Sequence, residues 1–288
     1  MISVIIPIYN GEEYLFKLVE AIRSQIVGQE IEIIAAVSKS NDRSFILAKE
    51  LCDLAYSVEE FNHGLTRHEA AQKSNGEYLV FITQDILPFN NMWLNELIKP
   101  LIENSNIVAT YSRQIAYPGA SKTESYIREY NYPPYNRLCN SYTIEKWGRK
   151  NIFYSDAASA TKREDFFGLG GYNFEVITNE DVYYALNVID SGNSILYNAN
   201  SIVYHSHDFS LKENIKRYES IGAFETTISS RLEKYSSNGE GLKLVRDVSW
   251  KLLRDFNVKE LMIFLLLDVP SRLFAYNKGK KSFLRRFN

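Results

Sequence analysis

The sequence contains little cysteine, no excess of positive charge and no long hydrophobic run. Its two cysteines, Cys52 and Cys139, lie far apart without the spacing of a metal site, which excludes a disulfide framework and indicates a reducing compartment. A net charge of −2 excludes a polycation built for nucleic acid, so we expect no nucleic-acid partner. The longest apolar run, residues 261–267, is far shorter than the roughly 18 residues needed to span a bilayer. We therefore expect a globular protein without a transmembrane helix.

The motifs of several common nucleotide-binding folds are also absent. Neither G-x-G-x-x-G nor G-x-x-x-x-G-K-[ST] occurs, which disfavours a dinucleotide-binding domain and a P-loop. Residues 7–14 lack the glycine-rich, basic phosphate loop that a nucleotidyltransferase would need. The opening stretch MISVIIPIYN is too short and too uncharged for a signal peptide, and it reads better as the first β-strand of a cytoplasmic protein.

The first 115 residues alternate between strand-like and helix-like segments. Apolar runs predict the strands, and apolar residues spaced along one helical face predict the helices between them. The expected strands are 2–6, 31–37, 56–58, 78–83 and 107–112, and the expected helices are 12–25, 44–55, 65–74 and 92–103. This alternation indicates an α/β fold with a mainly parallel sheet, whose ligands bind beyond the carboxyl ends of the strands.

The remaining sequence is less regular. The periodic pattern weakens over residues 117–154, and we expect an irregular, aromatic loop at YNYPPYNR (130–137). A helix over 178–189 and strand-like segments over 194–204 follow, and roughly the last 75 residues have a helical pattern.

Polar residues follow three of the expected strands and would meet at one edge of the sheet. They are Tyr9-Asn10-Gly11, residues 38–44 and Thr83-Gln84-Asp85. Asp85 is the most informative, because it follows a buried apolar run. A desolvated carboxylate is costly unless a proton, a cation or a hydrogen-bond donor offsets the cost. The three polar groups therefore predict a binding site that includes a partner for Asp85.

Several segments together resemble one enzyme family. IPIYNGEEYL (residues 6–15) resembles the opening strand and turn of family-2 glycosyltransferases, and NEDVYYAL (179–186) resembles their ED motif. FNHGLTR (61–67), TQDILP (83–88) and VYHSHDFS (203–210) are similar to segments of the bacterial rhamnosyltransferase branch of that family. The resemblance extends from residue 2 to about residue 225.

The resemblance implies a glycosyltransferase A fold, with a mainly parallel nucleotide-binding sheet flanked by helices and a C-terminal helical extension. The implied catalytic domain is 1–210, with a nucleotide-sugar half (1–115) and an acceptor half (116–210), and the extension is 211–288. Three positions depart from the usual pattern. Ile86 stands where the branch usually has alanine, and Val37 and Ser38 stand where the family has an acidic stretch whose first aspartate commonly contacts the nucleobase.

A nucleotide-diphosphate sugar donor implies a divalent cation, since cleavage of its glycosidic bond develops negative charge on the diphosphate. Mg²⁺ and Mn²⁺ prefer oxygen ligands and share them with phosphates and water. Asp85 is the expected carboxylate ligand, and the plainer interpretation is that it caps a strand–helix turn. His205 and His207 would share one face if the preceding strand continued, so we expect at least one to contact the metal or the diphosphate.

The ED motif implies Asp181 as general base, with Glu180 in support. Inverting transfer needs a carboxylate that takes the proton from the acceptor hydroxyl as it attacks the anomeric carbon. The alternative is that both acidic residues only favour a helix N-terminus. Asp156, within SDAAS, is a candidate contact for the acceptor.

Other residues of the matching segments are expected around the nucleotide sugar. Arg67 would bind the diphosphate as a bidentate cation, with an exposed salt bridge as the alternative. The candidates for this binding site are Pro7, Tyr9, Asn10, Glu12, Ser38, Asp42, Asn62, His63, Gly64, Arg67, Gln84 and Asp156.

The resemblance implies a metal-dependent, inverting transferase that moves L-rhamnose from dTDP-L-rhamnose to a cell-surface polysaccharide or a lipid-linked oligosaccharide. A transferase for a UDP-hexose and a non-catalytic nucleotide-sugar or glycan-binding module are the alternatives. From residue 272 onward there are six basic residues and no acidic one, after an apolar segment. This pattern is typical of contact with an anionic membrane surface, here the inner face of the cell membrane, with a solvated tail as the alternative.

Overall fold

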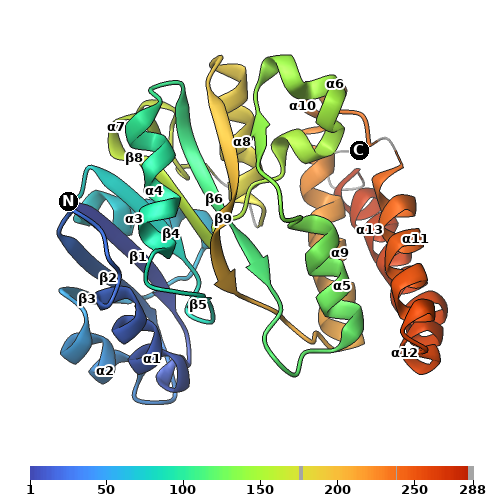
Figure 1. Cartoon of the computed structure of the whole chain (residues 1–288), viewed down its shortest axis with the longest axis horizontal. Helices are drawn as coiled ribbons and strands as arrows, with labels where there is room; N and C mark the ends of the chain where they lie inside the picture. Colours follow the sequence, from blue (N-terminus) through green and yellow to red (C-terminus); the bar gives the residue numbers. More distant parts are fainter. Residues whose placement is uncertain (175–177, 238, 285–288) are drawn as a thin grey trace.

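The computed structural model describes residues 1–174, 178–237 and 239–284. One continuous sheet organises them, in the strand order β3-β2-β1-β4-β8-β6-β9-β5, with β7 also paired to β9 (Figure 1). The nucleotide half contributes four parallel strands, β1 (Ile2–Ile8), β2 (Ile31–Ser38), β3 (Leu54–Val58) and β4 (Tyr78–Ile82). The apolar runs of β1, β2 and β4 are buried on both faces, as expected for a covered parallel sheet, whereas β3 is an edge strand of which only Val58 is buried.

The acceptor half continues the same sheet with mixed pairing. Its strands are β5 (Leu87–Pro88), β6 (Ile107–Ile115), β7 (Arg137–Cys139), β8 (Ala158–Lys162) and β9 (Ser194–Tyr204). Strand β8 lies antiparallel between β4 and β6, so β6 again points in the direction of β4, and β9 is parallel to β6. The carboxyl ends of β1, β2, β4, β6 and β9 therefore meet at one rim of the sheet.

Helices cover both faces of the sheet. One core joins the strands to α1 (Glu12–Arg23), α2 (Ser44–Leu51) and α4 (Trp93–Glu103). The opposite core joins them to α3 (His63–Lys73), α7 (Arg163–Gly168) and α8 (Glu180–Asp190). The expected helix at 65–74 starts two residues earlier, because the Asn62 side chain accepts hydrogen bonds from the Gly64 and Leu65 N–H groups at 3.0 Å and caps it.

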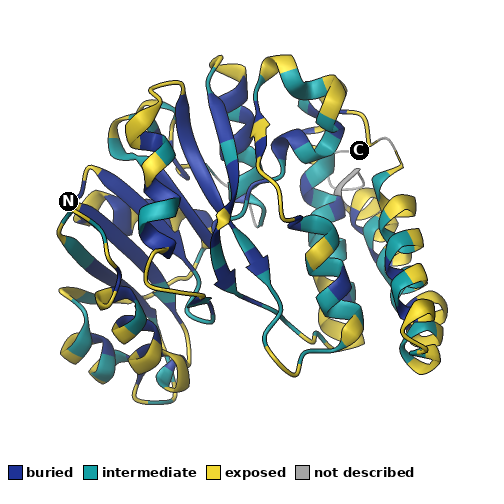
Figure 2. Ribbon diagram, viewed as in Figure 1, coloured by how far each residue is buried: buried dark blue, intermediate teal, exposed yellow. Residues whose placement is uncertain are grey.

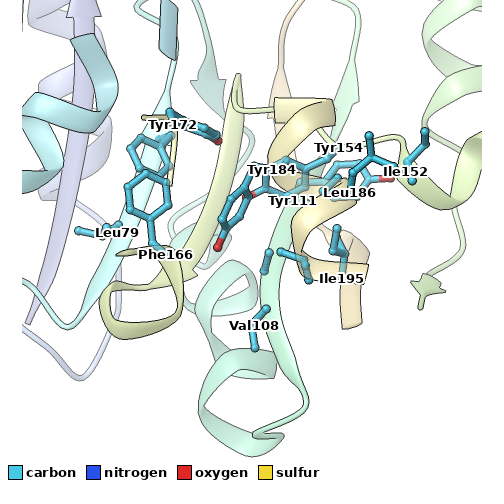
Figure 3. Packing of buried hydrophobic residues seen from close by; sticks show 14 of the residues in the cluster. Leu79, Val108, Tyr111, Ile152, Tyr154, Phe166, Tyr172, Tyr184, Leu186 and Ile195 are labelled. Atoms are coloured by element: carbon cyan, nitrogen blue, oxygen red, sulfur yellow. The ribbon is translucent and has the colours of Figure 1, made fainter. Parts of the chain in front are cut away.

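Aromatic rings fill the second core, which accounts for much of the tyrosine content. Phe166, Tyr172 and Tyr184 contact one another edge to face or tilted, with centroids 5.2–5.7 Å apart (Figure 3). The Tyr184 hydroxyl lies 2.8 Å from Thr161 Oγ1 on β8, so its polar end is satisfied inside the core. This packing holds the start of α8, which carries two candidate catalytic residues, against the sheet.

Within residues 117–154, positions 132–136 are irregular, as expected for YNYPPYNR, but regular elements flank them. They include α5 (Lys122–Asn131), strand β7 and the short helix α6 (Ile144–Trp147). Ser121 caps α5 by accepting a hydrogen bond from the Glu124 N–H at 3.1 Å. Few residues of α5 are buried, so the apolar periodicity that would have predicted it is weak.

The C-terminal extension consists of helices, as expected. They are α9 (Leu211–Thr227), α10 (Ser229–Leu232), α11 (Glu240–Arg254), α12 (Val258–Ile263), a π-helical segment (Phe264–Asp268) and α13 (Val269–Leu284). Helices α9 and α13 pack closely, since a Cβ added at Gly222 would lie 2.1 Å from the Tyr276 carbonyl oxygen. No helix in the described part of the chain has the length and apolar character to cross a membrane.

Candidate active site

The rim where the strand ends meet brings Asp85, His205 and His207 together. Asp85 follows β4 and the histidines follow β9, which lie on the same rim because both strands point the same way. His207 Nε2 is 3.3 Å from Asp85 Oδ2, and His205 Nε2 is 3.7 Å from Asp85 Oδ1. One ligand atom of each residue lies within 4.8 Å of the others. The strand ends at Tyr204, so continued strand alternation, as the sequence suggested, is not what brings the histidines together.

Gln114 and Arg128 fix the orientation of the His205 ring through its Nδ1 side. Its Nδ1 lies 2.8 Å from Gln114 Oε1, an atom that only accepts, and 3.3 Å from Arg128 Nη1, and the shorter contact favours a proton on Nδ1. Arg128 donates to the same oxygen, and Gln114 donates through Nε2 to Ser155 Oγ at 2.9 Å, which fixes the amide orientation. The lone pair of His205 Nε2 then faces Asp85, and this buried nitrogen has no hydrogen-bond partner among the described residues.

The protonation of this cluster favours a cation. Burial lowers the pKa of His205, and burial together with His205 lowers the pKa of His207 to about 4, so both rings are neutral at pH 7. Burial raises the pKa of Asp85, but its contacts with the His205 and His207 rings outweigh burial and lower this pKa. An anionic carboxylate that faces two neutral imidazole nitrogens is a donor set that a divalent cation fits. Asp85, His205 and His207 could therefore hold Mn²⁺ or Mg²⁺.

The loops after β1, β2 and β4 are tied to one another by several of the expected nucleotide-binding residues. Gln84 donates to the Tyr9 carbonyl at 2.9 Å and accepts from the Tyr9 N–H at 2.8 Å. Asn10 accepts from the Asn41 N–H at 2.9 Å, and Asp42 accepts from the Glu12 N–H at 3.1 Å. Glu12 in turn accepts from the Arg43 N–H at 2.9 Å. These side chains frame the rim rather than point freely into it.

A cavity of about 540 Å³ lies beside these loops. Seven of the expected residues line it, namely Pro7, Tyr9, Ser38, His63, Arg67, Gln84 and Asp85. Lys39, Glu59 and Phe61 also line it and were not expected from the sequence. The Ser38 hydroxyl, at the position where the family usually has an acidic stretch, is buried and has no hydrogen-bond partner among the described residues.

Arg67 is the centre of a buried ion cluster. Its Nε lies 2.9 Å from Asp156 Oδ2, its Nη1 lies 3.5 Å from Glu180 Oε1, and its Nη1 also donates to the His63 carbonyl at 2.9 Å. The Arg67 side chain is only 3% exposed, so the alternative of an exposed salt bridge is wrong. Gly64 allows this approach, since a Cβ there would lie 3.2 Å from Glu180 Cβ.

Asp181 lies at the start of α8 and faces a second cavity, of about 300 Å³. Its Oδ1 accepts from the Val182 N–H at 2.7 Å, and it forms no ion pair within the described ranges. Burial, followed by the charge of Asp156, raises the pKa of Asp181 to about 7. Burial likewise raises the pKa of Glu180 well above its usual value. A carboxyl group with a pKa near neutrality is suited to proton transfer at that pH.

The metal-binding candidates separate the two cavities. Asp85 lines the first, and His207 lines the second together with Asp181, Tyr132 and Arg217. Gln114, Arg128, Ser155 and Arg217 were not expected as site residues from the sequence, although Ser155 precedes Asp156 in SDAAS. A donor on one side and an acceptor on the other would therefore meet at the cluster.

A model of glycosyl transferase family 2 matches residues 3–167 of this chain. The chain belongs to glycosyltransferase family 2. Its relatives include two O-antigen chain rhamnosyltransferases, RfbN of Salmonella typhimurium and WbaN of Salmonella anatum. Each is 28% identical, over 97% and 96% of this chain respectively and 89% of the relative. The chain is thus a rhamnosyltransferase-like member of family 2, as the sequence motifs predicted.

Solved structures confirm the glycosyltransferase A fold. The mannosyltransferase PcManGT of Pyrobaculum calidifontis, solved with GDP-Man and Mn²⁺, is similar with a TM-score of 0.66 at 13% identity, over 97% of this chain and 86% of that one. Residues 1–349 of S. aureus TarS give a TM-score of 0.55 at 14% identity, over 99% and 91%. The family makes the activity of this chain glycosyl transfer.

Proposed function

We propose that the protein is a metal-dependent, inverting rhamnosyltransferase that transfers L-rhamnose from dTDP-L-rhamnose to a cell-surface polysaccharide or a lipid-linked oligosaccharide. One observation carries the proposal most directly: two cavities adjoin the Asp85–His205–His207 cluster, and Asp181 faces the second. The rhamnosyltransferase relatives support the sugar, and their O-antigen names support a surface glycan as acceptor.

The catalytic roles follow from this placement. Asp181 takes the proton of the acceptor hydroxyl, whose oxygen attacks the anomeric carbon while the bond from that carbon to the diphosphate oxygen breaks. The nucleoside diphosphate leaves with the negative charge, and the sugar is transferred with inversion. A divalent cation held by Asp85, His205 and His207 would neutralise this charge, a role supported by the Mn²⁺ in the PcManGT structure.

The buried ion cluster has a supporting role in this proposal. Arg67 holds Asp156 and Glu180, and Asp156 raises the pKa of Asp181. Arg67 also borders the nucleotide cavity, so contact with the diphosphate stays a prediction, as does contact of Asp156 with the acceptor. Residues 1–115 and 116–210 would serve donor and acceptor, with 211–288 as the extension.

A transfer assay with dTDP-L-rhamnose or UDP-glucose as donor and a bacterial glycolipid fraction as acceptor tests the proposal. We expect transfer from the thymidine donor, dependent on Mn²⁺ or Mg²⁺, with a product of opposite anomeric configuration by NMR. Transfer from UDP-glucose alone would favour the hexosyltransferase alternative. Retained anomeric configuration would contradict the role of Asp181 as base.

A further inference from the structure

Helix α12 and the π-helical segment that follows it expose large apolar side chains. Met262, Ile263 and the consecutive leucines Leu265, Leu266 and Leu267 are all exposed. Successive helical residues point in widely different directions, so this part of the helix contacts the protein along only a narrow side. Figure 2 shows the same end of the C-terminal helices as largely exposed. A helix that is apolar on most sides is normally covered by apolar material.

The turn before this helix adds an exposed aromatic ring. Helix α11 ends in a Schellman motif, in which Asn257 donates to the Leu252 carbonyl at 2.8 Å and Phe256 to the Leu253 carbonyl at 3.0 Å. Phe256 adopts φ of +54°, where glycine is favoured, and its side chain is 90% exposed. A bulky residue in this conformation is strained, and its exposed ring gains nothing from packing within the chain.

We name Phe256, Met262, Ile263, Leu265, Leu266 and Leu267 the apolar tip. The positive and negative side chains around the tip differ in how far they are engaged within the protein. Lys259 is exposed, and so is Arg254, although the Arg254 Nε lies 3.0 Å from Asp255 Oδ1. Asp255 also accepts from the Tyr126 hydroxyl, Glu260 accepts from the Thr123 N–H at 2.7 Å, and Asp268 pairs with Arg272 at 2.6 Å. These three carboxylates are thus engaged within the protein, and Lys259 presents positive charge to solvent beside the tip.

We propose that the apolar tip inserts into the surface of an anionic phospholipid bilayer, with Lys259 at the headgroups. Side chains that point in several directions from a narrow helix suit fluid hydrocarbon better than a flat protein surface. The sequence placed membrane contact in the basic tail. The structure adds an insertion element before that tail, while Lys278 in the tail pairs with Glu219 on α9 at 2.9 Å.

The tip also connects to the candidate active site. Ile263, Phe264 and Leu267 line a cavity of about 300 Å³ whose wall includes His207. If the proposed function is correct, docking would bring the acceptor side to the lipid surface. The bilayer contact itself does not depend on that function, and it can be measured without a transfer assay.

Co-sedimentation with phosphatidylcholine vesicles, with and without phosphatidylglycerol, tests the proposal on the full chain. Leu266→Asp places a charge at a position that is 62% exposed, and Phe16→Asp makes the same kind of change on α1 at 63% exposure as a control. We expect vesicle binding that requires phosphatidylglycerol. Leu266→Asp should lower it roughly tenfold or more, because a charge replaces a side chain that would lie in hydrocarbon, and Phe16→Asp should not change it.

Phe256→Gly separates lipid contact from folding. Glycine relieves the strained turn, so the melting temperature should rise or hold while vesicle binding falls. Binding of nucleoside diphosphate should stay unchanged in both tip variants. Equal vesicle binding by wild type and Leu266→Asp, or no binding by wild type, would overturn the proposal. A dimer that Leu266→Asp dissociates, with no vesicle binding, would identify a second copy as the occupant instead.

Discussion

Two charged clusters near the rim of the sheet use their polar atoms in opposite ways. In the first, Asp85 faces two neutral histidines, and the buried His205 Nε2 has no hydrogen-bond partner among the described residues. In the second, Arg67 is matched by Asp156 and Glu180 within the protein. The first cluster offers its donor atoms to a cation, whereas the second compensates its charges within the protein, even though Arg67 Nε and Asp156 Oδ2 form no hydrogen bond among the described residues. Compensation of charge within the protein thus separates the proposed binding residues from the supporting ones.

Asp181 borders the compensated cluster and forms no ion pair with any residue that the structure describes, so its replacement should have the largest effect on activity. Asp181→Asn should lower kcat roughly 10²- to 10⁴-fold, the contribution of a general base. In the wild type, the rate should rise with pH through about 7, because the carboxyl group must lose its proton to act as a base. Steady-state rates across pH measure both effects. Survival of that rising limb in the variant would remove Asp181 from the base role.

Removal of Arg67 would leave the buried Asp156 and Glu180 side chains without the cation that compensates them. Arg67→Met should destabilise the fold by about 3–5 kcal/mol, since two buried carboxylates lose their cation. Urea unfolding measures the change. Arg23→Met is the matched control, because its partner Asp53 is exposed and the pair should be worth at most about 1 kcal/mol. Equal effects of the two substitutions would contradict the buried role of Arg67.

Substitution of Gln114 tests whether its contact with His205 orients the cluster for metal binding. Gln114→Leu removes the acceptor that fixes the His205 ring, and Mn²⁺ affinity should fall roughly 10- to 100-fold. Electron paramagnetic resonance of free Mn²⁺ measures this affinity without turnover. Gln114→Glu, which keeps an acceptor oxygen, should bind more tightly than Gln114→Leu. Unchanged affinity in both variants would show that His205 does not depend on this contact.

Substitution of Asn62 should have the smallest effect on stability and activity. It tests whether this residue binds the nucleotide or only supports the fold. The structure uses its side chain as the cap of α3, although the sequence placed it at the nucleotide. Asn62→Ala should lower stability by about 1 kcal/mol and leave nucleotide affinity unchanged, whereas Asn62→Asp should keep the cap. A loss of affinity in both variants would return Asn62 to the nucleotide site.

The sequence predicted the parallel half of the fold well, because the apolar runs of β1, β2 and β4 are strong local signals. It also placed Asp85 at a strand end, and the family resemblance singled out His205 and His207. It could not show that β8 inserts antiparallel between β4 and β6, although this pairing sets the direction of β9. That topology, rather than strand alternation, brings the histidines to Asp85.

The residues that support the site were harder to predict. Gln114 and Arg128 act through contacts between β6, α5 and the segment after β9, and no short motif records such contacts. Arg67 lies in a recognised motif, yet the burial that pairs it with Glu180 depends on how α8 packs against Gly64. The sequence indicates which residue types suit the chemistry. Tertiary packing determines which of their polar atoms are already paired within the protein.

The most direct test of the central claim is calorimetric titration of dTDP and UDP into wild type and Asp85→Asn, with and without Mn²⁺. The account predicts tight binding of dTDP that requires Mn²⁺ in the wild type and is strongly weakened in Asp85→Asn. Binding that is equally tight without metal, or unchanged by Asp85→Asn, would contradict the assignment of Asp85, His205 and His207 as the metal site.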